Sequence, residues 1–204
     1  MIIPVALALL LSYLVGSVPF GFITGRLLGV DVRRHGSGNI GATNVLRVVG
    51  PAAAVPVLLL DASKGIAAVY LGRALAPGLD PAWAGTLAGM AAIAGHNWSV
   101  FLGFKGGKGV ATSAGVAMVL IPWSVVVGLI VFLATILITR YVSLGSLLAA
   151  AATAVYVLAV AAPLPFKVFG VAGAVFITVR HRSNIKRLLA GQEARLGQRA
   201  GPKS

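Results

Sequence analysis

Apolar residues fill most of the chain in long runs, and short segments rich in glycine, proline or charged residues separate these runs. A helix needs roughly 20 residues to cross a hydrocarbon core about 30 Å thick. We expect helices over residues 2–22, 51–73, 83–101, 110–121, 123–139, 144–161 and 166–179. The pattern therefore predicts an all-α, polytopic membrane protein with about seven transmembrane helices.

The apolar stretch over 110–139 is too long for one span of roughly 20 residues and too short for two. A single span would place Arg140 and the arginine-rich tail on opposite sides of the membrane, whereas two helices broken near Pro122 keep them on one side. We therefore expect 110–121 to be a short or partial helix and 123–139 to be a full one.

The apolar runs are expected to form one unit, because a chain of 204 residues can hold several spans and little else. The first run has neither a positively charged start nor a small-residue cleavage pattern, so we expect it to stay as a transmembrane helix. We predict a single integral membrane domain over residues 1–190 and a basic, flexible cytoplasmic tail over 191–204.

The basic residues gather on one face of this predicted topology. Of the 17 Lys and Arg residues, 14 fall on one side, Arg73 and Lys167 fall on the other, and Lys64 lies within a span. Because loops rich in Lys and Arg face the cytoplasm, we expect the N-terminus outside and the C-terminus inside. The same rule accounts for most of the net charge of +13, so no nucleic-acid partner is expected.

Composition narrows the chemistry further. The chain is 58% hydrophobic and has no cysteine, which excludes disulfides and thiolate chemistry. Its 4 acidic residues are scattered, and His35 and His96 lack the partners of a zinc site, so neither a metal site nor a cofactor is expected. Asp61 and Lys64 are three residues apart in an apolar run, where we expect a structural ion pair facing the bundle, with a proton relay as the alternative.

The first candidate site is the polar segment 36–44, which is followed by Arg47. Gly36, Gly38 and Gly41 let backbone N–H groups turn toward one point, and Arg47 adds a permanently charged fork, as a phosphate site requires. These glycines also match the spacing of a dinucleotide-binding loop, but a lipid-facing helix precedes them where that loop needs a strand. The alternative is a loop that only turns between two helices.

The second candidate site is the glycine- and lysine-rich segment 103–109. It is similar to a Walker A loop but fails that pattern, because Gly109 follows Lys108 where Ser or Thr is required. ATP is therefore not implied. Glycine amides that open the next helix, flanked by Lys105 and Lys108, still make an anion site. The alternative is that both lysines are ordinary residues of a cytoplasmic loop.

The third candidate site is the basic segment 180–187, where the last apolar run ends. His181 and Asn184 are three residues apart, so on a helix they share a face and can reach one substrate. The alternative is a basic stop that rests at lipid headgroups. A weaker fourth set, 140–146, contains Ser143, which either faces the same side of the membrane or caps a helix.

Together these segments resemble the three signatures of the bacterial acyl-phosphate:glycerol-3-phosphate acyltransferases. The strings that carry the resemblance are SGNIGATN at 37–44 with Arg47, GHNWSVF at 95–101 with GGKG at 106–109, and HRSN at 181–184. They occur in order over nearly the whole chain, to about Leu189. The resemblance implies a seven-helix membrane enzyme that acylates the 1-hydroxyl of sn-glycerol 3-phosphate with a fatty acyl phosphate, releasing phosphate and lysophosphatidic acid.

The resemblance also implies roles for individual residues. Ser37, His181 and Asn184 are expected to be catalytic. The residues expected to bind substrate or phosphate are Ser37, Gly38, Asn39, Asn44, Arg47, His96, Lys105, Gly106, Gly107, Lys108, Gly109, Ser143, His181 and Asn184. The expected partners are acyl phosphate, glycerol 3-phosphate, membrane lipid and an upstream enzyme that supplies acyl phosphate. The expected location is the bacterial plasma membrane, with the active site facing the cytoplasm.

The residues fit this chemistry, because two phosphates need two basic sites. An acyl phosphate is a mixed anhydride, so stabilising the departing phosphate and holding the hydroxyl close matter more than a strong base. We expect Arg47, Lys108 and glycine amides to hold the phosphates, His181 and Asn184 to orient the hydroxyl or bind its phosphate, and a substrate phosphate oxygen to accept the proton. From the residues alone, a binding or transport protein for a phosphorylated solute and a noncatalytic scaffold in lipid synthesis stay open.

Overall fold

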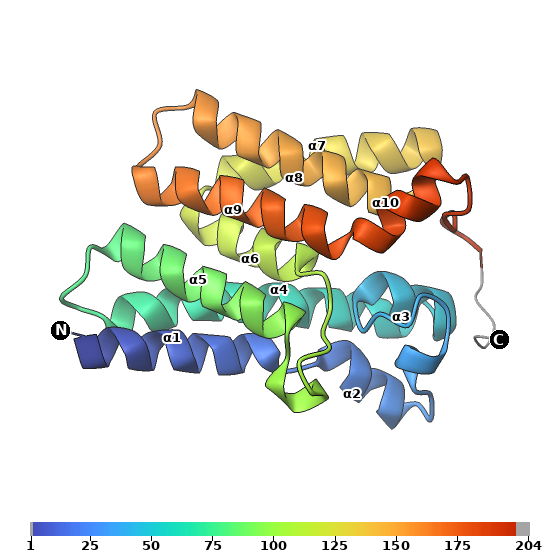
Figure 1. Cartoon of the computed structure of the whole chain (residues 1–204), viewed down its shortest axis with the longest axis horizontal. Coiled ribbons are helices and arrows are strands. Elements are labelled where there is room, and N and C mark those ends of the chain that lie inside the picture. Colours follow the sequence, from blue (N-terminus) through green and yellow to red (C-terminus); the bar gives the residue numbers. More distant parts are fainter. Residues whose placement is uncertain (1, 199–204) are drawn as a thin grey trace.

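The computed structural model describes residues 2–198, and within them every regular element is a helix (Figure 1). The α-helices are α1 (Ile2–Ser17), α2 (Phe20–Leu27), α3 (Ala42–Val48), α4 (Pro51–Leu75), α5 (Pro81–Asn97), α6 (Val110–Leu120), α7 (Pro122–Thr139), α8 (Val142–Ala159), α9 (Leu164–Arg180) and α10 (Arg182–Leu189). Two 3-10 helices, η1 (Val32–Arg34) and η2 (Val100–Leu102), lie in the connections. Each of the seven predicted apolar runs contains a helix, and the helix ends differ from the predicted ones by a few residues.

By length and composition, four segments can cross a membrane: the stretch that holds both α1 and α2, and the helices α4, α7 and α8. Counting α9 and α10 together, which are bent by 61°, gives five. The remaining two predicted runs form shorter helices, since α5 has 17 residues and α6 has 11. The chain is thus an all-helical protein with four or five candidate spans, and the expected partial helix over 110–121 is observed as α6.

The first predicted helix breaks and then continues past its predicted end. Pro19 has no N–H to donate, so the helix is interrupted after Ser17 and resumes as α2 up to Leu27. The carbonyl of Val18 at this break accepts a hydrogen bond from Lys64 Nζ at 3.0 Å. The break therefore offers an oxygen atom to a charged residue inside the bundle.

The helices form two packed groups. In the first group α4 and α5 contact each other and both α1 and α6; in the second group α8 packs between α7 and α9; contacts of α5 with α9 and of α6 with α7 join the groups. Glycine allows close approach within the first group: a Cβ at Gly65 of α4 would overlap the backbone of Thr112 of α6. Small residues at such contacts are typical of helices that associate in lipid.

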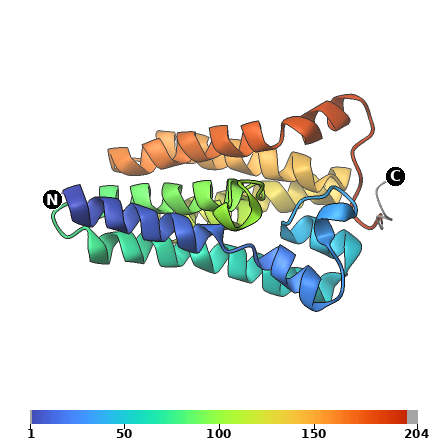
Figure 2. The same cartoon turned by 60° about the horizontal axis from the view of Figure 1, so that its bottom comes forward.

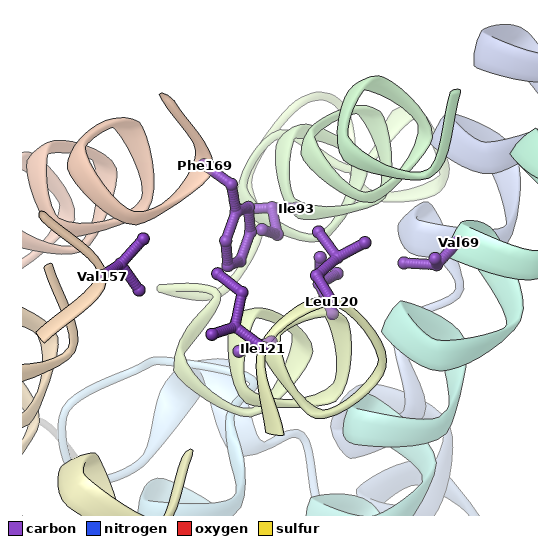
Figure 3. Close-up of a cluster of buried hydrophobic side chains, with 8 residues drawn as sticks. Val69, Ile93, Leu120, Ile121, Val157 and Phe169 are labelled. Atoms are coloured by element: carbon purple, nitrogen blue, oxygen red, sulfur yellow. The ribbon is translucent and has the colours of Figure 1, made fainter. Parts of the chain in front are cut away.

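A hydrophobic core closes the interface between the two groups. It contains Val69, Ile93, Leu120, Ile121, Val157 and Phe169, each at most 8% exposed (Figure 3). Helices α2, α3 and α10 lie at one end of the bundle, away from the start of α1 and the α4–α5 turn (Figures 1 and 2). The polar segments predicted from the sequence are therefore grouped at one end.

Candidate active site

One cavity of about 350 Å³ is lined by segments that lie far apart in the sequence. Its polar wall includes Ser37, Asn39, Asn44, Arg47, Asp61, His96, Lys108, Ser143, His181, Asn184 and Glu193. Apolar residues of α6, α7, α8 and α9 line the rest and carry the cavity into the bundle. The structure thus brings residues of all three predicted motifs, together with Ser143, to a single space.

The apolar part of this cavity also has a wall that faces outward. Leu58 of α4 and Leu129 of α7 line the cavity, yet their side chains are 48% and 52% exposed. Both helices are long and apolar enough to cross a membrane, so their exposed apolar side chains face lipid. The apolar cavity therefore reaches the outer, apolar surface of the bundle at Leu58 and Leu129.

The first motif forms a loop held together by Asn44. This side chain is 2% exposed; its amide nitrogen donates to the carbonyls of Val32 and Asn39, both at 2.8 Å, and its oxygen accepts from the N–H of Ser37 at 2.9 Å. Gly38 has φ +70°, a conformation that favours glycine. With the amide of Asn44 engaged in this way, the hydroxyl of Ser37 is left exposed beside the cavity.

Arg47 of α3 reaches the cavity from the side of this loop. Its Nη2 donates to the carbonyl of Ala194 at 3.0 Å, while its Nε is buried with no hydrogen-bond partner in the described structure. Burial lowers the pKa of the Arg47 guanidinium from its ordinary value, and Glu193 opposes that shift. A guanidinium keeps its charge in proteins, so a buried donor is available to an anion.

The second motif is a loop whose glycine carbonyls are held by Arg180. Arg180 donates through Nε and Nη2 to the carbonyl of Gly107, at 3.1 and 2.9 Å, and through Nη2 to that of Gly106 at 3.2 Å. Gly109, with φ +77°, ends the loop and starts α6. The first N–H groups of a helix have no partner within it, so the start of α6 offers free donors beside Lys108.

The two lysines of this loop differ in position. Lys108 lines the cavity and donates to Oδ1 of Asn184, whereas Lys105 is exposed and lines no part of the cavity. The pKa of the Lys108 ammonium is lowered to about 8, mainly by burial. The positive charges of nearby arginines add to this lowering of the pKa, and the negative charge of Glu193 opposes it in part. Of the two lysines, only Lys108 faces the place where a substrate can lie.

His96 supports the glycine loop from inside the bundle. Its carbonyl accepts from the N–H of Gly107 at 2.9 Å, and a Cβ at Gly107 would overlap its ring. Its Nδ1 lies 2.8 Å from Lys64 Nζ, which is also 2.8 Å from Asp61 Oδ1. The predicted Asp61–Lys64 ion pair is therefore present and buried, and it extends to a residue that contacts the second motif.

The third motif lies at the bend between α9 and α10. His181 and Asn184 are each 3% exposed and both line the cavity. Nδ1 of His181 lies 2.8 Å from the carbonyl of Ile177, and because a carbonyl oxygen only accepts, Nδ1 carries the proton. Nε2 of a neutral ring is then left as an acceptor.

Glu193 is the residue that sequence reasoning missed. It lies in the segment predicted to be a flexible tail, yet it is 6% exposed and accepts hydrogen bonds from Ser143 at 2.7 Å, Asn184 at 2.6 Å and Arg187 at 2.7 Å. Burial raises the pKa of the Glu193 carboxyl, but these donors outweigh it and hold the pKa below its ordinary value. The described part of the tail is thus attached to the site; residues 199–204 lie outside the described residues.

A second, more polar cavity of about 390 Å³ adjoins the first. The two share Ser37, Asn39 and Lys108. The second is also lined by Gly38, Trp98, Gly106, Val179, Arg180, Arg182, Ser183 and Arg187. A basic chamber and a largely apolar chamber therefore meet at Lys108.

The comparisons with known proteins agree with this arrangement. The family model described as glycerol-3-phosphate acyltransferase matches residues 6–191. A glycerol-3-phosphate acyltransferase of Symbiobacterium thermophilum is 47% identical over 195 residues, which cover 96% of each chain. One from Synechococcus elongatus is 45% identical over an alignment of 205 positions, which covers 98% of each chain.

Solved structures give the same result. A crystal structure of PlsY (YgiH), an integral membrane glycerol 3-phosphate acyltransferase, in its glycerol 3-phosphate form matches with a TM-score of 0.87 and 38% identity, covering 95% of this chain and 96% of that chain. Its lysophosphatidic acid form matches with a TM-score of 0.85 and 37% identity over the same shares. The family model and the relatives span nearly the whole chain, so this chain belongs to the glycerol-3-phosphate acyltransferase family.

Proposed function

We propose that this membrane enzyme transfers a fatty acyl group from acyl phosphate to the 1-hydroxyl of sn-glycerol 3-phosphate, giving lysophosphatidic acid and phosphate. The relatives are named for acylation of glycerol 3-phosphate, and the related crystal structures hold glycerol 3-phosphate and lysophosphatidic acid. The observation that carries the proposal is the meeting of a basic chamber and an apolar cavity at Lys108. This arrangement fits two phosphates beside one acyl tail.

The chambers suggest which substrate lies where. Glycerol 3-phosphate enters the basic chamber, where Arg182 and Arg187 join Lys108 around its phosphate. The acyl tail lies in the apolar cavity, and the phosphate of the donor lies near Arg47 and the start of α6. Each anion then faces permanent positive charge or free N–H groups, which is the form of stabilisation that acyl transfer with an anionic leaving group needs.

The reaction depends more on holding the 1-hydroxyl of glycerol 3-phosphate close to the acyl carbonyl carbon than on a strong base. The 1-hydroxyl oxygen bonds to the acyl carbonyl carbon, the carbon–oxygen bond to phosphate breaks, and a phosphate oxygen of the substrate takes the hydroxyl proton. Nε2 of His181 and the exposed hydroxyl of Ser37 orient the attacking hydroxyl, and Asn184 keeps Lys108 directed at the anions. Holding the reacting atoms close supplies much of the rate of such a step.

A direct assay tests the proposed reaction. Purified protein supplied with palmitoyl phosphate and glycerol 3-phosphate is expected to form lysophosphatidic acid and phosphate in equal amounts, and to form no lysophosphatidic acid when glycerol 3-phosphate is left out. Uptake of glycerol 3-phosphate into proteoliposomes without acyl product would instead identify a transport protein. If the protein shows neither acyl product nor uptake, a noncatalytic scaffold role is the interpretation that remains.

The pH dependence should identify the ammonium of Lys108 as a binding group. Because its pKa is lowered to about 8, its charged fraction falls as pH rises through that value, and kcat/KM for glycerol 3-phosphate should fall with it. In Lys108→Arg the cation stays charged, so the alkaline decline near pH 8 should disappear even if the rate is lower. The measurement is initial rate against pH, corrected for uncatalysed hydrolysis. An identical decline in both proteins would assign it to another group.

The proposed topology has seven helices, the N-terminus outside and the site on the cytoplasmic side of the bacterial plasma membrane. The segregation of basic residues supports it. The natural chain has no cysteine, so single cysteines can report on each side. In right-side-out vesicles, an impermeant maleimide should label Gly78→Cys in the α4–α5 turn and should label Arg34→Cys only after permeabilisation. The reverse pattern would invert the topology.

A further inference from the structure

The apolar cavity follows one face of α9 in steps of one helical turn. His181, Ile177, Gly173 and Phe169 are spaced by four residues, all four are buried, and all four line the cavity. Residues at this spacing lie one above another on a helix face. The face therefore runs from the polar wall at His181 to the hydrophobic core at Phe169.

Gly173 is the position on this face where no side chain fills the space. A Cβ at this buried glycine would meet no atom within 4 Å. By contrast, a Cβ at Gly170, one turn before Ala174, would meet Val157 at 3.4 Å, an ordinary contact. Buried space of this kind is unusual in a packed interior, where side chains interdigitate with few voids.

Phe169 marks the end of the open space. Its side chain is 3% exposed and packs in the cluster that contains Ile121 and Val157 (Figure 3). At a rise of 1.5 Å per residue, Gly173 lies roughly 12 Å and Phe169 roughly 18 Å from His181 along the helix. A chain that starts at the polar wall would thus pass Gly173 before it reaches the core.

We propose that Gly173 determines the length of the acyl chain that the enzyme accepts, by leaving open the part of the cavity between Ile177 and Phe169. This inference rests on the proposed function, in which the acyl tail occupies the apolar cavity. The missing side chain at Gly173 admits the distal carbons of the tail, and Phe169 ends the space. The opposite walls, which include Gly128, Ala149 and Ala150, also present small residues to this region.

Substitution at Gly173 tests the proposal. Gly173→Ala and Gly173→Leu add volume step by step, and both residues favour a helix more than glycine does. The ratio of kcat/KM for palmitoyl phosphate to that for octanoyl phosphate should fall from the natural protein to Gly173→Ala and further to Gly173→Leu. A fall of about ten-fold or more is expected for leucine, the discrimination typical of one or two methylenes in an apolar pocket.

Val175→Leu is the matched control, because Val175 is on the same helix but 54% exposed on its outer side. Its chain-length ratio should equal that of the natural protein. An unchanged ratio in active Gly173 variants would overturn the proposal, and so would a folded Gly173→Leu that has lost octanoyl transfer, since that short tail ends above Gly173. If the natural protein itself forms no lysophosphatidic acid with either donor, the proposed function fails instead.

Discussion

A Lys108→Ala enzyme is expected to lose acyl transfer by about 10²–10³-fold in kcat, the cost typical of removing one preorganised donor from a charge-stabilising site. Lys108 is the cationic side chain shared by the two chambers in the described structure, so in the proposed function its charge acts on both the donor phosphate and the attacking substrate. Its removal also leaves Asn184 Oδ1 without its donor. The measurement is the steady-state rate with both substrates at saturation.

Lys105→Ala is the control for this experiment, because the two lysines belong to the same loop and carry the same charge. Lys105 is exposed and lines neither chamber, so its substitution should leave kcat within about two-fold, as surface changes usually have small effects. Near-native turnover in Lys108→Ala, or an equal loss in both variants, would refute the assignment.

Replacement of Glu193 by alanine should reduce both activity and stability. Three donors, from Ser143, Asn184 and Arg187, would lose their shared acceptor in a buried place. Breaking a buried, hydrogen-bonded charge pair costs about 3–5 kcal/mol, and the exposed fraction of 38% for the Arg187 side chain places this case at the lower end. We expect a lower thermal midpoint in detergent together with a large loss of kcat.

Glu193→Gln separates the two effects. Glutamine keeps the shape and one acceptor oxygen, so it should recover most of the thermal midpoint, while kcat should stay low because the negative charge near Lys108 and Arg187 is lost. A Glu193→Ala protein with the natural midpoint and the natural rate would show that the attachment of the tail has no role in the site.

The helices were predictable because the apolar runs are long and proline marks several starts. Pro51, Pro81 and Pro122 each stand at the first position of a helix, where a missing N–H costs nothing. The end of the first run was less predictable. The polar residues after Phe22 indicate a loop, but the helix continues and Arg26 lies over the Phe22 ring at 5.4 Å.

The site was predictable in its members but not in their directions. Local patterns show which residues can bind an anion, and the three motifs do meet at one cavity. They do not show that Lys105 points away while Lys108 points in, because this depends on the path of the loop against His96 and Arg180. Glu193 had no local signature, since its partner Ser143 is 50 residues away in the sequence.

The exposed wall formed by Leu58 and Leu129 has a consequence for how the fatty acyl donor of the proposed reaction reaches the site. Each methylene moved from hydrocarbon into water costs about 0.8 kcal/mol, so a fatty chain that had to pass through the aqueous phase would meet a steep barrier on arrival and departure. In the proposed function, we expect the tail to enter the apolar cavity from the leaflet past Leu58 and Leu129 and the new lipid to leave the same way, while the small ionic reactant and the released anion exchange through the arginine-lined chamber. The lipid-soluble molecules and the water-soluble ions would then use different entrances to the same site.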